Sequence, residues 1–249
     1  MGVGDMIELK NLTKRFGDIV AVHRLTLSVP EGEIFGFIGP NGAGKTTALR
    51  MMGGVIAPTE GSVIMDGINM AIDPENAKKG IRFIPDSPFL SEKLTGMEFL
   101  RFTADLYGVE EDLFYERSEK ILRQFSLDHW ADELIESYSH GMKQRLIISS
   151  TLLHDPKAIV VNEPMVGLDP AGMRMVKDLF RSLAKRGTTI FMSTHTLTVA
   201  EDVCDRIGVI HKGSLIATGT IEELRQRAEV QEGGLEEVFL ILTEGESVP

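Results

Sequence analysis

The chain has 249 residues, of which 43% are hydrophobic and 25% charged, and its formal net charge is −11. This composition and length are typical of a soluble globular protein with one large or two small domains. The apolar stretches are far shorter than the roughly 18 residues of a membrane span. The first residues also lack the pattern of a secretory signal. The single cysteine, Cys204, excludes an internal disulfide framework and fits a reducing cytosol, and the acidic charge argues against nucleic acid as the main ligand.

Strands alternate with helices in the first part of the chain. The expected elements are β-rich runs over 6–29, a strand over 33–39, a helix over 45–52 and a strand over 62–65. Asp66-Gly67 is a hairpin signal directly after that last strand. Asp73-Pro74 is typical of a helix cap followed by a first-turn proline. Such alternation predicts a sheet flanked by helices.

Residues 88–155 have a different character, because helical patterns replace the strand-like runs. Thr95 and Glu98 form a predicted capping box in front of an apolar-periodic run. The α/β pattern then resumes with a strand over 158–161, a helix over 170–186, strands over 188–192, 207–210 and 215–218, and a helix capped at Thr220. The prediction is one domain, with an α/β core over 1–87 and 156–249 and an inserted helical subdomain over 88–155.

Residues 39–46 match G-x-x-x-x-G-K-[ST] at every fixed position, between a predicted apolar strand and a predicted helix. This pattern is the P-loop: glycines let backbone N–H groups surround a phosphate chain, and the following helix presents its positive end to the anion. Lys45 would place a positive charge on the β- and γ-phosphates, and the Thr46 hydroxyl would bind Mg²⁺. The sequence therefore predicts binding of a nucleoside triphosphate.

Two further segments give the chain a resemblance to the ATP-binding cassette of ABC transporters, and this resemblance covers nearly the whole chain. Residues 138–145 resemble the family's signature segment, with Ser139 and Gly141 kept and His140 where a glycine is usual. Residues 158–164 resemble the Walker B strand. The resemblance implies that Glu163 is the carboxylate that orients or deprotonates the attacking water, and it places Asn162 where the family has an aspartate.

Four other positions receive roles from the resemblance. Phe16 lies where an aromatic ring stacks on adenine, and His195 lies where a histidine senses the γ-phosphate. Residues 167–169 resemble the D-loop, which crosses a dimer interface. Asp86 occupies the place of the Q-loop glutamine, and we hypothesise that its charge replaces the carboxylate missing at Asn162.

The resemblance implies an α/β fold, with a P-loop NTPase (RecA-like) core, a mixed sheet, an antiparallel N-terminal part and an inserted helical subdomain. The expected catalytic residues are Glu163, His195 and Lys45, and the expected metal ligands are Thr46, Asp86 and Asn162. The expected nucleotide-binding residues are Phe16, Gly39, Pro40, Asn41, Gly42, Ala43, Gly44, Lys45, Thr46, Thr47, Ser139 and Gly141. The expected cofactors are ATP and Mg²⁺.

The function expected from the resemblance is that of an ATPase subunit which powers a separate membrane-embedded permease. Two copies, or a pair of cassettes, would close on ATP at the cytoplasmic face of the membrane, without any role for nucleic acid. Phe89, Leu90, Leu94 and Met97 are candidate contacts for the permease. Residues 235–240 resemble the tails of cassettes of the drug- and antibiotic-export type, so an exporter is expected. The alternatives are a soluble ABC ATPase acting on ribosomes or DNA, and a module that binds ATP with weak hydrolysis.

Overall fold

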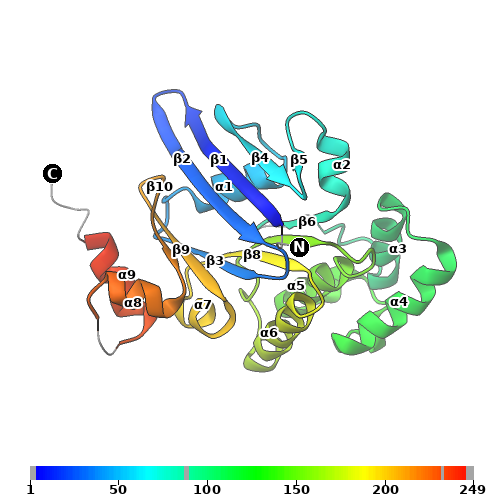
Figure 1. The fold of residues 1–249 in the computed structure, drawn as a ribbon. Coiled ribbons are helices and arrows are strands. Elements are labelled where there is room, and N and C mark those ends of the chain that lie inside the picture. Colours follow the sequence, from blue (N-terminus) through cyan, green and yellow to red (C-terminus); the bar gives the residue numbers. More distant parts are fainter. Residues whose placement is uncertain (1–3, 87–89, 231–232, 245–249) are drawn as a thin grey trace. The chain divides into compact units, whose positions relative to one another are not determined.

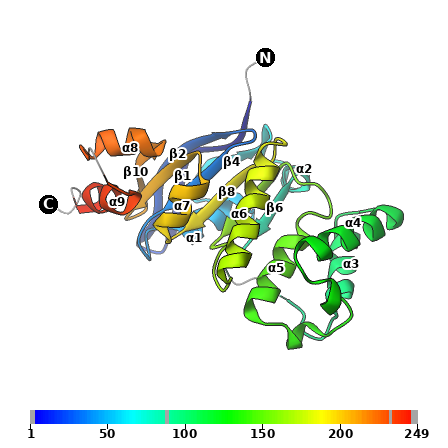
Figure 2. The same ribbon diagram turned by 90° about the horizontal axis from the view of Figure 1, so that it is seen from below.

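The computed structural model describes residues 4–86, 90–230 and 233–244 (Figures 1 and 2). Its contacts divide the chain into two compact units, which are described separately below. Unit 1 comprises 1–85, 157–163 and 180–249, and unit 2 comprises 86–156 and 164–179. Within the described ranges, no helix is long and apolar enough to span a bilayer.

Unit 1 contains an antiparallel four-stranded sheet with the order β2-β1-β4-β5. Its strands are β1 (Asp5–Phe16), β2 (Ile19–Pro30), β4 (Glu60–Met65) and β5 (Ile68–Asn69). Asp66 and Gly67 both have positive φ, at 49° and 74°, as the tight hairpin between β4 and β5 requires. The expected antiparallel N-terminal part is therefore confirmed.

The second sheet of unit 1 is mixed and has the order β10-β9-β3-β8-β7-β6. Its strands are β3 (Ile34–Ile38), β6 (Ile81–Ile84), β7 (Ala158–Asn162), β8 (Thr189–Thr194), β9 (Arg206–His211) and β10 (Ser214–Gly219). All neighbours are parallel except β9 and β10. The registers Ile38↔Thr194 and Asn162↔Ser193 bring the carboxyl ends of β3, β7 and β8 to one edge, where ligands bind in such sheets.

Helix α1 (Lys45–Met52) contacts β2 of the first sheet and β7 and β8 of the second, so it lies between the two sheets. The core on this side includes Phe191, whose ring centroid lies 5.3 Å from that of Phe35 and 5.4 Å from that of Phe37. A second apolar cluster joins the opposite face of the mixed sheet to α7, α8 and α9. The remaining helices of unit 1 are α2 (Pro74–Lys79), α7 (Leu197–Val203), α8 (Ile221–Arg227) and α9 (Leu235–Glu244). The α1 helix, and with it the P-loop, is therefore fixed by burial on two sides.

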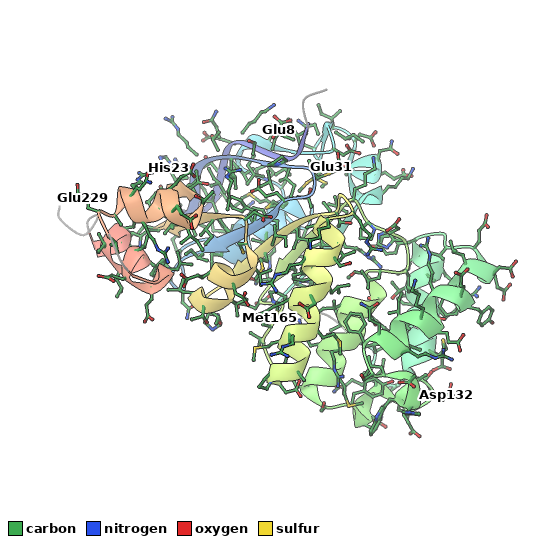
Figure 3. All side chains as sticks on the ribbon, turned by 60° about the horizontal axis from the view of Figure 1, so that its bottom comes forward. Glu8, His23, Glu31, Asp132, Met165 and Glu229 are labelled. Carbon is green, nitrogen blue, oxygen red and sulfur yellow. The ribbon has the colours of Figure 1, made fainter. Side chains whose placement is uncertain are left out.

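Unit 2 is built from helices. They are α3 (Gly96–Leu106), α4 (Glu111–Gln124), α5 (His140–Ser150), two short 3-10 turns (Asp128–Trp130 and Ile135–Ser137) and the first part of α6 (Pro170–Ala184). The capping box of Thr95 and Glu98 is present at the start of α3, as predicted. Asp132, in the connection from α4 to α5, lies at the surface of this unit (Figure 3).

Sequence and structure differ at several boundaries. Strand β6 was not among the expected elements, α6 ends at Ala184 and not at residue 186, and β8 continues to Thr194. Residues 164–179 group with unit 2 because their first loop packs on α5: Gln144 Nε2 donates to the Pro164 carbonyl at 3.3 Å. The expected domain division at residues 87/88 and 155/156 stays a prediction, and Phe89 lies outside the described residues.

Candidate functional site

The P-loop connects β3 to α1 and needs glycine at two positions. A Cβ on Gly39 would lie 2.3 Å from the Ile210 carbonyl oxygen, and one on Gly44 would lie 2.4 Å from that of Ala21. Gly44 also has φ of 105°, which other residues rarely adopt. The backbone can therefore curve around an anion directly before the helix N-terminus.

Lys45 lies folded into the loop. Its Nζ donates to the carbonyls of Gly39 at 2.6 Å and Pro40 at 3.1 Å, and the residue is 8% exposed. Burial lowers the pKa of Lys45 below its usual value, and the Glu163 carboxylate partly opposes this shift. A buried ammonium hydrogen-bonded to two neutral carbonyls is positioned to bind phosphate oxygens, because an anion would relieve the cost of its desolvation.

Thr46 and Asn162 meet beside the loop. The Asn162 amide Nδ2 donates to the Thr46 hydroxyl at 3.3 Å, and Asn162 is 5% exposed at the end of β7. Ser193 is the register partner of Asn162 on β8 and is fully buried. Its hydroxyl has no hydrogen-bond partner among the residues that the structure describes. Asn162 and Ser193 at the strand ends, together with Thr46 in the first turn of α1, are therefore three neutral polar side chains.

Glu163 follows β7 with a positive φ of 51°, a conformation that costs a non-glycine residue energy. The surrounding residues hold it there. Oε1 accepts from the His195 backbone N–H at 3.0 Å and lies 2.7 Å from His195 Nδ1, and Oε2 accepts from the Thr194 hydroxyl at 3.1 Å. The structure therefore joins the predicted catalytic carboxylate to the predicted sensor histidine.

Phe16, at the end of β1, is 51% exposed. Lys14 Nζ lies 5.2 Å from the centroid of its ring and donates to the Ala57 carbonyl at 2.7 Å. The exposed ring can stack on a flat base.

Three further candidates, Ser139, Gly141 and Asp86, belong to unit 2. Ser139 caps α5, and its hydroxyl accepts from the Met142 N–H at 3.3 Å. A Cβ built on Gly167 would lie 1.9 Å from His140 Nδ1, so the imidazole occupies the space over that glycine. One on Gly141 would lie 2.9 Å from the Gly167 carbonyl oxygen. Asp86 is exposed at the start of this unit.

Unit 1 brings together most of the residues that the sequence predicts as site residues. Contacts join Lys45 to the loop, Thr46 to Asn162, and Glu163 to His195. Sequence reasoning missed Ser193 and Thr194 as site residues. The signal was available, since both directly precede His195 at the end of an apolar strand.

Comparisons with known proteins identify the family of this chain. The ABC transporter family profile matches residues 22–166. The ABC-type transporter ATP-binding protein EcsA of Bacillus subtilis is 32% identical over 238 residues, which cover 96% of each chain. The bacitracin transport ATP-binding protein BcrA of Enterococcus faecalis is 38% identical over 223 residues, covering 89% of this chain and 71% of that protein.

Solved structures give the same answer. An ATP-binding subunit of an ABC transporter superposes with a TM-score of 0.90 and 31% identity, covering 95% of this chain and 99% of that one. A dimeric ATP-binding cassette in a post-hydrolysis state, bound to ADP and phosphate, gives 0.77 and 27%, covering 87% of this chain and 99% of that one. The chain therefore belongs to the ABC transporter family, as an ATP-binding and ATP-hydrolysing subunit.

Proposed function

We propose that this chain hydrolyses Mg²⁺-ATP at the P-loop of unit 1 and thereby powers a separate membrane-embedded permease. The observation that carries the proposal is the meeting of Lys45, Thr46, Asn162 and Glu163 at one edge of the mixed sheet. A cation for phosphate, polar oxygens for a metal and a held carboxylate are the parts that phosphoryl transfer to water needs.

The residues present fit Mg²⁺. This ion takes one or two protein ligands and completes its shell with water and nucleotide phosphates. Thr46 and Asn162 would hold it, and the unpartnered Ser193 hydroxyl could bind one of its waters. When bound, Mg²⁺ would neutralise charge on the phosphates.

The chain's own residues would do the rest. Lys45 would bind the β- and γ-phosphates, and Phe16 would stack on adenine. Glu163 would orient the attacking water and accept its proton, while Thr194 and the His195 backbone hold the carboxylate in position. His195 would sense the γ-phosphate.

We propose further that two copies, or this chain and a second cassette, close on ATP. Ser139 and Gly141 stand at the exposed N-terminus of α5, where backbone N–H groups favour an anion. In a closed pair they would face the partner's nucleotide, and hydrolysis would release the pair. A related cassette is dimeric with ADP and phosphate bound, which supports this arrangement.

The direction of transport we propose is export. The support is the relative that serves bacitracin transport, together with the expected tail over 235–240, which forms the start of α9. The chain would lie on the cytoplasmic face, attached through its permease.

The test is purification of the tagged chain from native membranes, with the Lys45→Ala variant in parallel. We expect one co-purifying polypeptide with predicted membrane spans, whose reconstitution with the wild type, and not with Lys45→Ala, gives ATP-dependent transport. Ribosomal proteins or DNA in place of a membrane polypeptide would contradict the proposal. So would absence of ATP turnover by the purified complex.

A further inference from the structure

Unit 1 contains an apolar pocket, and none of its lining residues belongs to the proposed nucleotide site. The pocket has a volume of about 120 Å³ and lies where the end of α1, strand β4 and the start of α2 come together. Met51 of α1, Val63 of β4 and Met70 line it and are 1%, 2% and 8% exposed, so they form its inner wall. Ala57 and Ala71 also line it and are exposed, so a molecule can enter from solvent.

The backbone N–H groups around the pocket are already used. The N–H of Met70 donates to the Val63 carbonyl at 2.9 Å, and the N–H of Ala71 donates to Asn69 Oδ1 at 2.9 Å. Pro58, which also lines the pocket, has no N–H. These parts of the wall therefore offer no free donor to a bound molecule.

Two carbonyls of the lining residues are also engaged. The Gly54 carbonyl accepts from Lys78 Nζ at 3.1 Å, and the Ala57 carbonyl accepts from Lys14 Nζ at 2.7 Å. The side chains that line the pocket contain no nitrogen or oxygen atom. A buried water needs roughly two to four polar partners, so this wall favours an apolar molecule over water.

The two methionines and the volume narrow the class of ligand. A Cβ built on Gly54 would lie 2.9 Å from Met70 Sδ, so the sulfur lies against the backbone of another lining residue. A thioether is polarisable, adapts its shape and makes favourable contacts with aromatic rings. An apolar cavity of roughly 150 Å³ can hold benzene, so a slightly smaller pocket matches a single ring.

We propose that this pocket binds a small uncharged aromatic molecule, consisting of one ring with at most a short substituent. A charged ring compound is excluded because no lining side chain can pair with its charge, and burial of an unpaired charge is costly. The ammonium groups of Lys14 and Lys78, which bind carbonyls of the lining residues, would in addition repel a cation. The proposal does not depend on the nucleotide site.

The experiment is a titration of the full chain with toluene, followed by NMR of isotope-labelled methionine methyl groups. We expect the resonances of Met51 and Met70 to shift along saturable curves, with a dissociation constant on the order of 1 mM or below. Met142 and Met165 belong to unit 2 and should not shift. Benzylammonium, which carries a charge on the same ring, should leave Met51 and Met70 unchanged.

Val63→Phe is the variant that fills the pocket from its inner wall. The new ring would occupy the space of the ligand, so toluene should bind about tenfold more weakly or not at all. The matched control is Val166→Phe, which adds the same ring at a valine of unit 2 that is 46% exposed, and toluene should bind it as it binds the wild type.

The wild-type titration decides the question even if Val63→Phe does not fold. Shifts that rise linearly with toluene, or that are equal at Met142 and Met165, would overturn the proposal. Equal binding of benzylammonium would overturn the assigned class of ligand. Unchanged toluene binding by a folded Val63→Phe variant would show that the molecule binds elsewhere, and the proposal would be wrong.

Discussion

The two units hold their candidate residues in opposite ways. In unit 1, Lys45 and Asn162 are 8% and 5% exposed and are fixed by hydrogen bonds from their own side chains. In unit 2, Ser139 and His140 are exposed, and a helix cap and a close approach to Gly167 fix their backbone. Buried polar groups are positioned before a ligand binds, whereas an exposed turn can become buried when a partner binds to it. Substitutions in unit 1 should therefore change nucleotide chemistry directly, and substitutions in unit 2 should act through a partner or through the turn.

The largest effect is expected from Lys45→Ala. This change removes a charge-assisted contact worth about 1.5–3 kcal/mol, so nucleotide affinity should fall roughly ten- to a hundredfold and hydrolysis should become undetectable. Phosphate release and nucleotide titration measure the two effects. The control is Lys10→Ala, because Lys10 is exposed and pairs with Glu8 on the same strand. Unchanged turnover in Lys45→Ala would contradict the assignment of the loop.

Glu163→Gln tests whether the exposed turn of unit 2 at Ser139 binds a second copy of the chain. Glutamine keeps an oxygen that can accept from Thr194 and His195, but it cannot take a proton from water. Binding should survive while hydrolysis stops, so Mg²⁺-ATP should trap a dimer in size-exclusion chromatography. Adding Ser139→Ala should weaken that dimer. A variant that stays monomeric with ATP at high protein concentration would require another model of pairing.

Gly167→Ala tests whether the close approach of the His140 ring to Gly167 stabilises unit 2. The new Cβ would collide with the His140 ring at 1.9 Å, and φ of 79° would be strained, so we expect a loss of about 2–3 kcal/mol in stability. Gly108→Ala is the matched control, because its φ is 64° but no atom lies within 4 Å of the added Cβ. In the His140→Ala background the difference in stability between the two glycine variants, measured by thermal or denaturant unfolding, should disappear. Equal losses in both glycine variants, with no rescue, would show that the imidazole does not occupy that space.

A smaller effect is expected from pH. Burial lowers the pKa of Lys45 in the free protein below its usual 10.5, and bound phosphate should raise it again. Nucleotide affinity should therefore fall as pH rises through the lowered pKa, with uptake of protons on binding. Calorimetry in two buffers of different ionisation enthalpy measures this uptake. Lys45→Arg should bind without it, and equal proton uptake by both proteins would assign the titration to another group.

Much of unit 1 could be predicted from the sequence, because its elements carry local signals. The helix over 45–52 and the caps at Asp73 and Thr220 appear at the expected residues, as does the Thr95 cap of unit 2. Strand β6 escaped because Ile81–Ile84 is short and carries Arg82, which interrupts its apolar run. Its identity as a strand comes from pairing with β7, a contact that is distant in sequence.

The candidate site likewise contains residues that local motifs predict and residues that only contacts between distant segments bring to it. Lys45 and Glu163 were found from motif positions. Thr194, which donates to Glu163, and Ser193, the register partner of Asn162, were not named as site residues although they precede His195, because their places at the site follow from the parallel register of β7 and β8. The close approach of the His140 ring to Gly167 likewise joins two segments that are distant in sequence. The sequence pattern of one segment does not predict its contact with a segment that is distant in sequence.

The smallest effect concerns Phe16, an exposed candidate residue of unit 1. Lys14 lies over one face of the ring and is tied to the Ala57 carbonyl, so it should restrict the ring and leave the other face for adenine. An exposed cation–π contact is worth about 0.5–1 kcal/mol. Lys14→Met should therefore weaken ATP binding about two- to fivefold and leave the turnover at saturating ATP unchanged. Lys10→Met is the control on the same strand. An equal loss of affinity for tripolyphosphate, which has no base, would show that Lys14 interacts with the phosphates. Lys14 would then have no role in positioning the ring of Phe16.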